Sequence, residues 1–173
     1  MANVVLIGMP GCGKSTVGVL LAKALGMSFV DTDVVLQARE RRKLQAIINE
    51  IGIDAFLLRE EKAILGLDCD RTVVATGGSV VYGRRAMEHL HKGGIVVYIR
   101  LPYEVIRSRL SNLATRGVTL RPGQTLRDLY DERVPLYEAE ADIVFDAENG
   151  DIEQTVERIA ACLRARMEGV DGQ

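Results

Sequence analysis

The sequence has little of what marks secreted, metal-binding or membrane-spanning proteins. Its three cysteines, Cys12, Cys69 and Cys162, are an odd number without metal-ligand spacing, which favours a reduced, cytoplasmic setting. Its two histidines, His89 and His91, would diverge on a helix, which argues against a metal pair. No apolar run is long enough to cross a bilayer, and the N-terminus lacks the charged-then-apolar plan of a signal peptide.

The chain also lacks an excess of charge of one sign. Lys and Arg number 22 against 24 Asp and Glu, for a net charge of −2 and a pI near 5.8. No overall basic field therefore points to nucleic acid, and the basic run at 39–43 is interpreted as a solvated helix face. The 173 residues contain no repeat, low-complexity tract or linker. We expect one domain over residues 1–173, a monomer with no nucleic-acid or membrane partner.

What the sequence does contain is a glycine-rich stretch near its N-terminus. Residues 8–16 read GMPGCGKST and fit the pattern G-x-x-x-x-G-K-[ST]. A short β-branched run at 3–7 precedes it, and apolar residues at helical spacing follow as far as Gly26, a candidate C-cap. Strand, loop and helix in this order are the context that a phosphate-binding loop needs.

The residue types in this loop suit ATP and Mg²⁺. Gly11 and Gly13 let backbone N–H groups approach phosphate oxygens, and the helix start adds free N–H groups and a positive dipole end. Lys14 would neutralise the β- and γ-phosphates, and the Ser15 hydroxyl would ligate Mg²⁺. The expected ATP-binding residues of the loop are Gly11, Cys12, Gly13, Lys14, Ser15 and Thr16.

Apolar, β-rich runs alternate with helical patterns along the rest of the chain. The runs lie at 28–33, 72–78, 94–101 and 141–146, and the helical patterns at 34–48, 53–66, 84–91, 102–113, 125–138 and 151–167. This alternation predicts an α/β fold, a parallel sheet with helices on both faces, with ligands at the carboxyl ends of the strands. The unpatterned stretch 112–124, which contains Gly and Arg, is interpreted as a lid beside the phosphate site.

Two aspartates end the second predicted strand. Asp31 and Asp33 are two residues apart, so in extended chain their side chains would point to the same side. One could orient Mg²⁺ while the other accepts a proton from an attacking hydroxyl. A compatible alternative is that Asp33 caps a helix that opens at Val34. The next strand ends in Thr76 and is followed by Gly77 and Gly78, without the carboxylate of common P-loop ATPases, which favours a small-molecule kinase.

In these motifs the chain resembles the shikimate kinases over nearly its whole length. The resemblance rests on GMPGCGKSTVG with LAKALG, FVDTD, ATGG and ERVPLYEAEAD, in that order and spacing. It implies a three-layer P-loop kinase fold with a five-stranded sheet, a lid that closes over ATP, and transfer of the γ-phosphoryl group to a ring hydroxyl of shikimate. On the nucleotide side, the resemblance implies that Lys14 binds the phosphates and that Ser15 and Asp31 bind Mg²⁺. On the acceptor side, it implies that Asp33 binds and deprotonates the acceptor hydroxyl and that Arg133 binds the acceptor carboxylate. Gly77 and Gly78 would line the acceptor pocket.

The acceptor side of the chain departs from the family pattern. Leu57 stands where the family has a second carboxylate-binding arginine, within an acceptor-binding region expected at about 33–61. Arg59 lies roughly 200° away around a helix, so it cannot simply substitute. Ser79 replaces a glycine and would add a hydroxyl to the pocket wall. The family's lid arginine, which would contact ATP and take part in catalysis, corresponds by spacing to Arg116, with Arg121 as a competitor.

Three functions remain open at this point. The first is ATP- and Mg²⁺-dependent phosphorylation of shikimate with a reorganised clamp, in which Arg133 binds the carboxylate bidentately. The second is a related kinase for another small hydroxy acid, such as homoserine or gluconate. The third is a catalytically silent nucleotide-binding protein. For Arg133 itself, the alternative to binding a carboxylate is a surface residue paired with Asp131 or Glu132.

Overall fold

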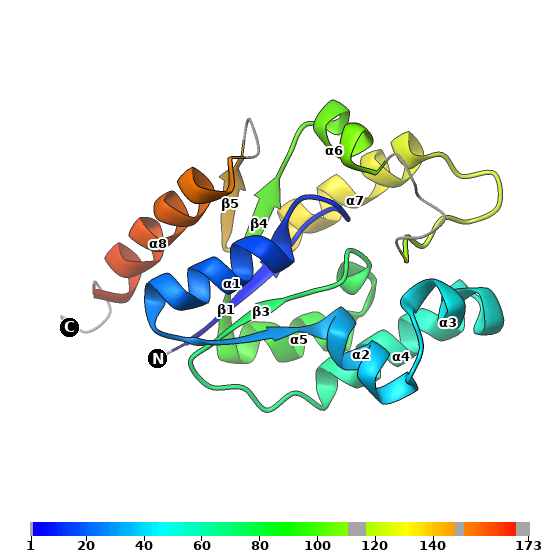
Figure 1. The fold of residues 1–173 in the computed structure, drawn as a ribbon, viewed down its shortest axis with the longest axis horizontal. Helices are drawn as coiled ribbons and strands as arrows, with labels where there is room; N and C mark the ends of the chain where they lie inside the picture. Colours follow the sequence, from blue (N-terminus) through cyan, green and yellow to red (C-terminus); the bar gives the residue numbers. More distant parts are fainter. Residues whose placement is uncertain (1, 111–116, 148–150, 169–173) are drawn as a thin grey trace.

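Five parallel strands form the centre of the molecule in a computed structural model that describes residues 2–110, 117–147 and 151–168 (Figure 1). Their spatial order is β2-β3-β1-β4-β5. The central strands are continuous apolar runs because helices cover both of their faces. The strands are β1 (Asn3–Ile7), β2 (Ser28–Asp31), β3 (Thr72–Ala75), β4 (Gly94–Arg100) and β5 (Ile143–Asp146). The predicted α/β fold with a five-stranded parallel sheet is confirmed.

The phosphate-loop sequence lies where the strand order reverses. In the register of the sheet, Val5 of β1 pairs with Val74 of β3 on one side and with Val96 of β4 on the other. The chain leaves β1 toward β2 and β3, and later returns to β4 on the opposite side. The loops that follow β1 and β3 therefore lead to opposite faces of the sheet and leave a crevice between them at its carboxyl edge. This is the place where open α/β sheets bind ligands.

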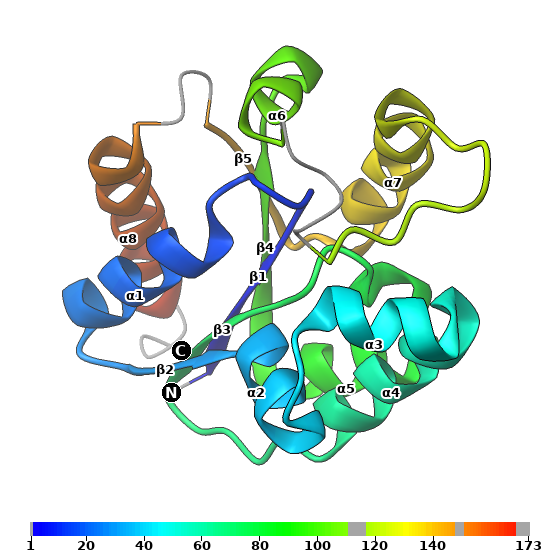
Figure 2. The same cartoon turned by 45° about the vertical axis from the view of Figure 1, so that its right-hand side comes forward.

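Helices form the two outer layers (Figure 2). On one face lie α1 (Lys14–Leu25) and α8 (Ile152–Glu168), and on the other lie α5 (Arg84–Gly93) and α7 (Leu126–Glu140). The short α6 (Tyr103–Arg109) stands at the carboxyl end of β4, and the 3₁₀-helix η1 (Val80–Tyr82) follows β3. Across the described ranges, no helix is both long and apolar enough to span a membrane.

A separate group of three helices follows β2. These are α2 (Thr32–Glu40), α3 (Leu44–Ile51) and α4 (Ile53–Leu65), which lie together past the carboxyl end of β2, with α4 beside α5 (Figure 1). They enclose a small apolar cluster of their own, distinct from the main core on the two faces of the sheet. Its buried members are Leu36, Ile47, Ile48, Phe56 and Ala63.

Three details of the predicted elements were wrong. The helix expected at 34–48 is two helices, because the chain turns at Arg41, whose left-handed φ of 53° ends α2 without a glycine to signal it. The helix expected to reach 113 ends at Arg109, and residues 111–113 lie outside the described ranges. The residue that caps α2 is Asp31 and not Asp33: its side chain accepts the N–H groups of Asp33 and Val34.

Candidate active site

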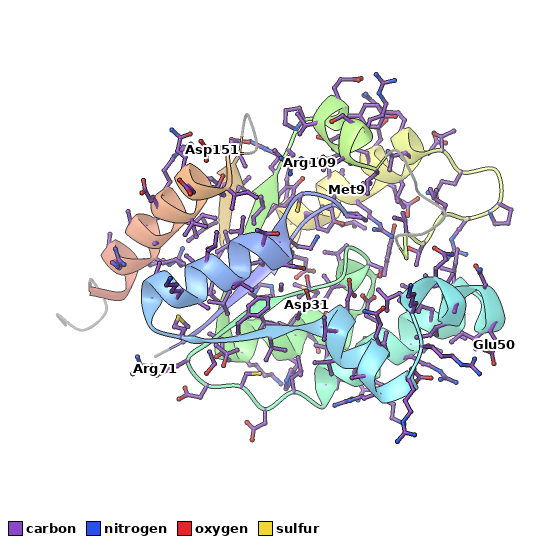
Figure 3. All side chains as sticks on the ribbon, viewed as in Figure 1. Met9, Asp31, Glu50, Arg71, Arg109 and Asp151 are labelled. Atoms are coloured by element: carbon purple, nitrogen blue, oxygen red, sulfur yellow. The ribbon has the colours of Figure 1, made fainter. Side chains whose placement is uncertain are left out.

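A cavity of about 490 Å³ opens at the carboxyl edge of the sheet. Figure 3 shows Met9 of the glycine-rich loop and Arg109 of α6 above Asp31, which lies at the end of β2. Residues from six separate segments border it, which include Ser15, Asp33, Gly78, Arg109, Gly117 and Ile152. A smaller cavity of about 300 Å³ lies at the amino edge of the sheet and contains none of the predicted site residues.

The glycine-rich loop has the conformation of a phosphate cradle. Gly11 and Gly13 adopt positive φ values of 78° and 97°, which side chains rarely allow. Within the described residues no side chain caps the start of α1, so its first N–H groups are available to an anion. The buried Lys14 ammonium donates to the carbonyls of Gly8 (2.8 Å) and Met9 (2.9 Å), which holds it over the loop. The Cys12 side chain is buried at 4% exposure, so only its backbone can face a ligand.

The two predicted metal ligands lie in contact. The Ser15 hydroxyl donates to Asp31 Oδ2 at 2.5 Å, while Asp31 Oδ1 caps α2. A hydroxyl and a carboxylate are oxygen donors of the kind Mg²⁺ prefers, and Mg²⁺ usually completes its shell with waters and phosphate oxygens. Ser15 and Asp31 would therefore hold Mg²⁺ together with waters and phosphate oxygens. The described residues contain no cluster of three or more His, Cys, Asp or Glu that could bind a metal ion alone.

Asp33 reaches the same edge of the sheet from the first turn of α2, and not from the strand that the sequence predicted. Its carboxylate borders the cavity beside Gly77: a Cβ on Gly77 would lie 2.7 Å from Asp33 Oδ1. Burial raises the pKa of Asp33 to about 6, and the negative charge of Asp31 adds to the rise while Lys14 opposes it. A half-buried carboxylate with a raised pKa is suited to accept a proton from an alcohol.

The turn after β3 packs too tightly for side chains at its first two positions. The N–H of Gly77 donates to Thr32 Oγ1 at 3.2 Å. A Cβ on Gly78 would lie 2.8 Å from Pro10 Cδ and 3.0 Å from Arg133 Nη1. The Gly78 carbonyl accepts the Tyr137 hydroxyl at 2.5 Å. This turn, Gly77–Gly78–Ser79, is therefore fixed between α2, the phosphate loop and α7.

Arg133 is the most deeply buried guanidinium of the described residues, at 1% exposure. It donates to Thr119 Oγ1 (2.5 Å) and to the Tyr82 hydroxyl (3.3 Å), and it lies over the Tyr82 ring. The alternative of a surface ion pair is wrong, because Asp131 pairs with Arg127 and Glu132 accepts the Tyr82 hydroxyl. Within the described ranges Arg133 forms no ion pair with a carboxylate, although burying an unpaired charge is costly.

Comparison with known proteins decides the family. A family model described as "Shikimate kinase" matches residues 10–164. This chain belongs to the shikimate kinase family. Members of the family are ATP-dependent kinases that phosphorylate a hydroxyl group, generally with Mg²⁺.

Relatives match over nearly their whole length. The shikimate kinase of Thermodesulfovibrio yellowstonii is 37% identical over 162 residues, which cover 92% of this chain and 93% of that protein. Shikimate kinase 2 of Salmonella typhimurium is 33% identical over 168 residues, covering 93% and 92%. Among solved structures, the shikimate kinase of Acinetobacter baumannii in complex with shikimate has a TM-score of 0.88 at 30% identity, covering 96% and 94%. That of Aquifex aeolicus has a TM-score of 0.80 at 30% identity, covering 95% and 98%.

The departures from the family pattern have clear positions in the fold. Leu57 is half-buried against the apolar cluster of α2, α3 and α4. Arg59 pairs with Glu40 on the outer side of these helices, so it does not take the place of an arginine at 57. The expectation that Ser79 turns its hydroxyl into the pocket was wrong. This hydroxyl donates to Glu60 Oε2 at 2.6 Å instead.

The expected lid is only partly described. Arg116, the expected lid arginine, lies outside the described residues with the rest of 112–116. Its competitor Arg121 pairs with Asp54 of α4 at 2.9 Å and does not border the cavity. A Cβ on Gly117 would lie 2.8 Å from Leu44 Cβ of α3. The described part of this segment therefore rests on the helices that follow β2.

Two residues of the site were missed as site residues. Arg109 donates to the Gly11 carbonyl at 3.2 Å and borders the cavity. Its position in the last turn of a helix after β4 gave no signal in the sequence. Glu60 is the second of these residues. Its place among Phe56, Ala63 and Ile64, on the buried face of α4, was the signal that could have found it.

Glu60 is a carboxyl with unusual acid–base properties. Burial raises its pKa from 4.5 to about 7. The hydrogen bond from Ser79 opposes this rise, the charge of Asp33 adds to it, and the charges of Arg133 and Lys14 oppose it. The folded chain therefore keeps a proton at Glu60 in a range of pH where the unfolded chain releases it.

We expect Glu60→Gln to gain stability relative to the wild type as pH rises. The raised pKa stabilises the folded wild type below about pH 4.5, and this stabilisation is lost as pH rises to about 7. Glutamine has no proton to lose, so the difference in the free energy of unfolding should change by on the order of 3 kcal/mol between pH 4.5 and 8. Urea unfolding measures it, with Glu157→Gln, at an exposed position of α8, as the control. A difference that stays constant with pH would contradict the prediction.

Proposed function

We propose that this chain transfers the γ-phosphoryl group of ATP, with Mg²⁺, to a hydroxyl of shikimate. The observation that carries this proposal is the buried Arg133, which has no carboxylate partner in the described ranges and approaches Gly78 at the wall of the phosphate-loop cavity. A carboxylate on the acceptor would compensate that charge. Support also comes from the Acinetobacter baumannii relative, which was solved in complex with shikimate.

On the nucleotide side the residues bind and neutralise phosphate. The N–H groups of the loop and of the start of α1 would hold phosphate oxygens, and Lys14 would move from the carbonyls of Gly8 and Met9 to the β- and γ-phosphates. Ser15 and Asp31 would hold Mg²⁺, which when bound neutralises charge on the phosphates. Arg109, on the same side of the cavity, would contact the nucleotide.

On the acceptor side the residues orient one alcohol. Arg133 would bind the acceptor carboxylate, and the Gly77–Gly78–Ser79 turn would form the wall along which the acceptor lies. Asp33 would accept the proton of the hydroxyl that attacks the γ-phosphorus. Since phosphoryl transfer needs mainly positioning and charge neutralisation, this set of groups is sufficient for the reaction.

Leu57 gives a reason to test other acceptors. One charge-assisted hydrogen bond contributes about 1.5–3 kcal/mol, so a clamp with one arginine fewer would bind shikimate about 10- to 100-fold more weakly. A smaller hydroxy acid such as homoserine, or gluconate, could be held by Arg133 and leave room for Leu57. Arg116 in the lid would assist transfer in either case.

An acceptor panel tests the proposal. Purified protein with ATP and Mg²⁺ is given shikimate, homoserine or gluconate, and ADP release is followed together with the mass of the product. We expect shikimate to stimulate ADP release and to gain one phosphate. Stimulation by homoserine or gluconate alone would reassign the acceptor. Tight ATP binding with no stimulated turnover would indicate a silent nucleotide-binding protein.

A further inference from the structure

Glu60 depends on one neighbour for its hydrogen bonding. It is the only acidic side chain that is buried among the described residues, at 4% exposure. Its Oε2 accepts the Ser79 hydroxyl at 2.6 Å, and its Oε1 has no hydrogen-bond partner in the described part of the chain. Among the described residues, α4 forms ion pairs through Asp54 and Arg59, and Glu60 takes part in neither.

Leu57, one helical turn before Glu60 on α4, is apolar and supplies no cation to the Glu60 carboxyl. Side chains three positions apart on a helix are neighbours, so position 57 lies beside Glu60 on α4. Leu57 is apolar and packs against the cluster of α2, α3 and α4. The Ser79 hydroxyl is consequently the one donor that the described structure offers to this carboxyl, which otherwise would be buried without compensation.

Glu60 also touches the turn that forms the acceptor wall. A Cβ on Gly77 would overlap Glu60 Oε1, while Ser79, two residues later, donates to Oε2. Asp33 Oδ1 would lie 2.7 Å from the same Cβ on Gly77, and Arg133 Nη1 approaches Gly78. Any shift of Glu60 would therefore move the turn relative to both Asp33 and Arg133.

We propose that Ser79 and Glu60 are a specificity-determining pair for the acceptor: the Ser79 hydroxyl holds the buried carboxyl, which in turn fixes the Gly77–Gly78–Ser79 turn between Asp33 and Arg133. Glu60 is a positioning residue, since it acts through the turn. The proposal makes positions 57 and 79 interdependent, because either a hydroxyl at 79 or a cation at 57 can satisfy Glu60. It rests on the proposed function where it concerns shikimate.

Four proteins test the pair through acceptor binding: the wild type, Ser79→Ala, Leu57→Arg and the double variant. Ser79→Ala should raise the KM for shikimate about tenfold, because a lost hydrogen bond to a buried carboxyl lets the turn shift. The KM for ATP should change by less than about twofold, since the loop is untouched. Leu57→Arg should reverse most of the increase when it is combined with Ser79→Ala. In the wild type, where Ser79 already binds Glu60 Oε2, its effect on the KM should be smaller and limited to what the added arginine contributes by binding the shikimate carboxylate itself.

Two surface variants serve as controls. Leu58→Arg adds the same guanidinium next to position 57, but on a side chain that is 69% exposed, and Ser108→Ala removes an exposed hydroxyl. Neither should change the KM for shikimate. An unchanged KM in Ser79→Ala would overturn the proposal. So would an effect of Leu57→Arg of equal size in both backgrounds.

The midpoint of urea unfolding, measured for the same four proteins, tests the pair without any acceptor. Leu57→Arg should raise the midpoint of unfolding in the Ser79→Ala background and not in the wild type, because Glu60 lacks a hydrogen-bond donor only in the former. If the wild type does not phosphorylate shikimate, the proposed function fails, while the unfolding cycle still decides on the pair. Additive midpoint shifts would refute the interdependence of the two positions.

Discussion

Asp33→Asn is expected to lower kcat by about 100- to 10,000-fold, the usual contribution of a general base. Asparagine keeps the size of the side chain but cannot accept the proton of the acceptor hydroxyl. The KM for ATP should stay within about threefold, because Lys14 and Ser15 on the nucleotide side are unchanged. Steady-state kinetics with shikimate and ATP varied separately measure both effects.

Asp70→Asn is the matched control for this substitution, since it lies just before β3, at the amino edge of the sheet and away from the cavity. It should leave kcat unchanged. If Asp33→Asn lowers turnover and ATP affinity by the same factor, Asp33 belongs to nucleotide binding. A near-normal kcat in Asp33→Asn would show that Asp33 is not the general base.

Lys14→Met should lower kcat by about 100- to 1,000-fold, as expected for the loss of one preorganised charge on the transferred group. Methionine has a similar length but no ammonium to move from the loop carbonyls onto the phosphates. The loss should be larger in kcat than in ATP affinity, because the charge on the transferred group is greatest in the transition state. Turnover and ATP binding by calorimetry separate the two.

Lys23→Met provides the comparison, since this lysine lies in the last turn of the same helix α1 and is exposed. It should behave as the wild type. Because Lys14 also donates to Gly8 and Met9, the urea midpoint of Lys14→Met must be measured alongside. An unchanged midpoint with near-wild-type turnover would refute the role of the loop.

The phosphate loop of this site could be predicted because its groups are neighbours in the sequence, unlike Arg109, which reaches the loop from α6. Residues 8–16 form the whole loop, and their function depends on backbone conformation that glycine spacing reveals. The strands were equally visible, since burial on both faces leaves continuous apolar runs. Gly26 ends α1 in the left-handed conformation that its position predicted.

The acceptor side could not be predicted to the same depth because it is assembled from distant segments. The Ser79 hydroxyl was expected in the pocket, but its partner Glu60 lies 19 residues away in sequence, on a helix whose apolar pattern can place Glu60 in the interior without identifying its partner. Thr119, which binds Arg133, lies in the least patterned stretch of the chain. The turn at Arg41 carries no glycine or proline, so a single long helix was the natural expectation.

The small apolar cluster of α2, α3 and α4 is packed separately from the main core on the two faces of the sheet. This separation has a consequence for how the protein can evolve. Replacements such as an apolar side chain at position 57 can be absorbed inside this cluster, with the strands left undisturbed. Selection can therefore act on acceptor recognition and on phosphate chemistry through different sets of residues. A lineage could acquire a new acceptor by repacking these three helices while it keeps the same nucleotide site.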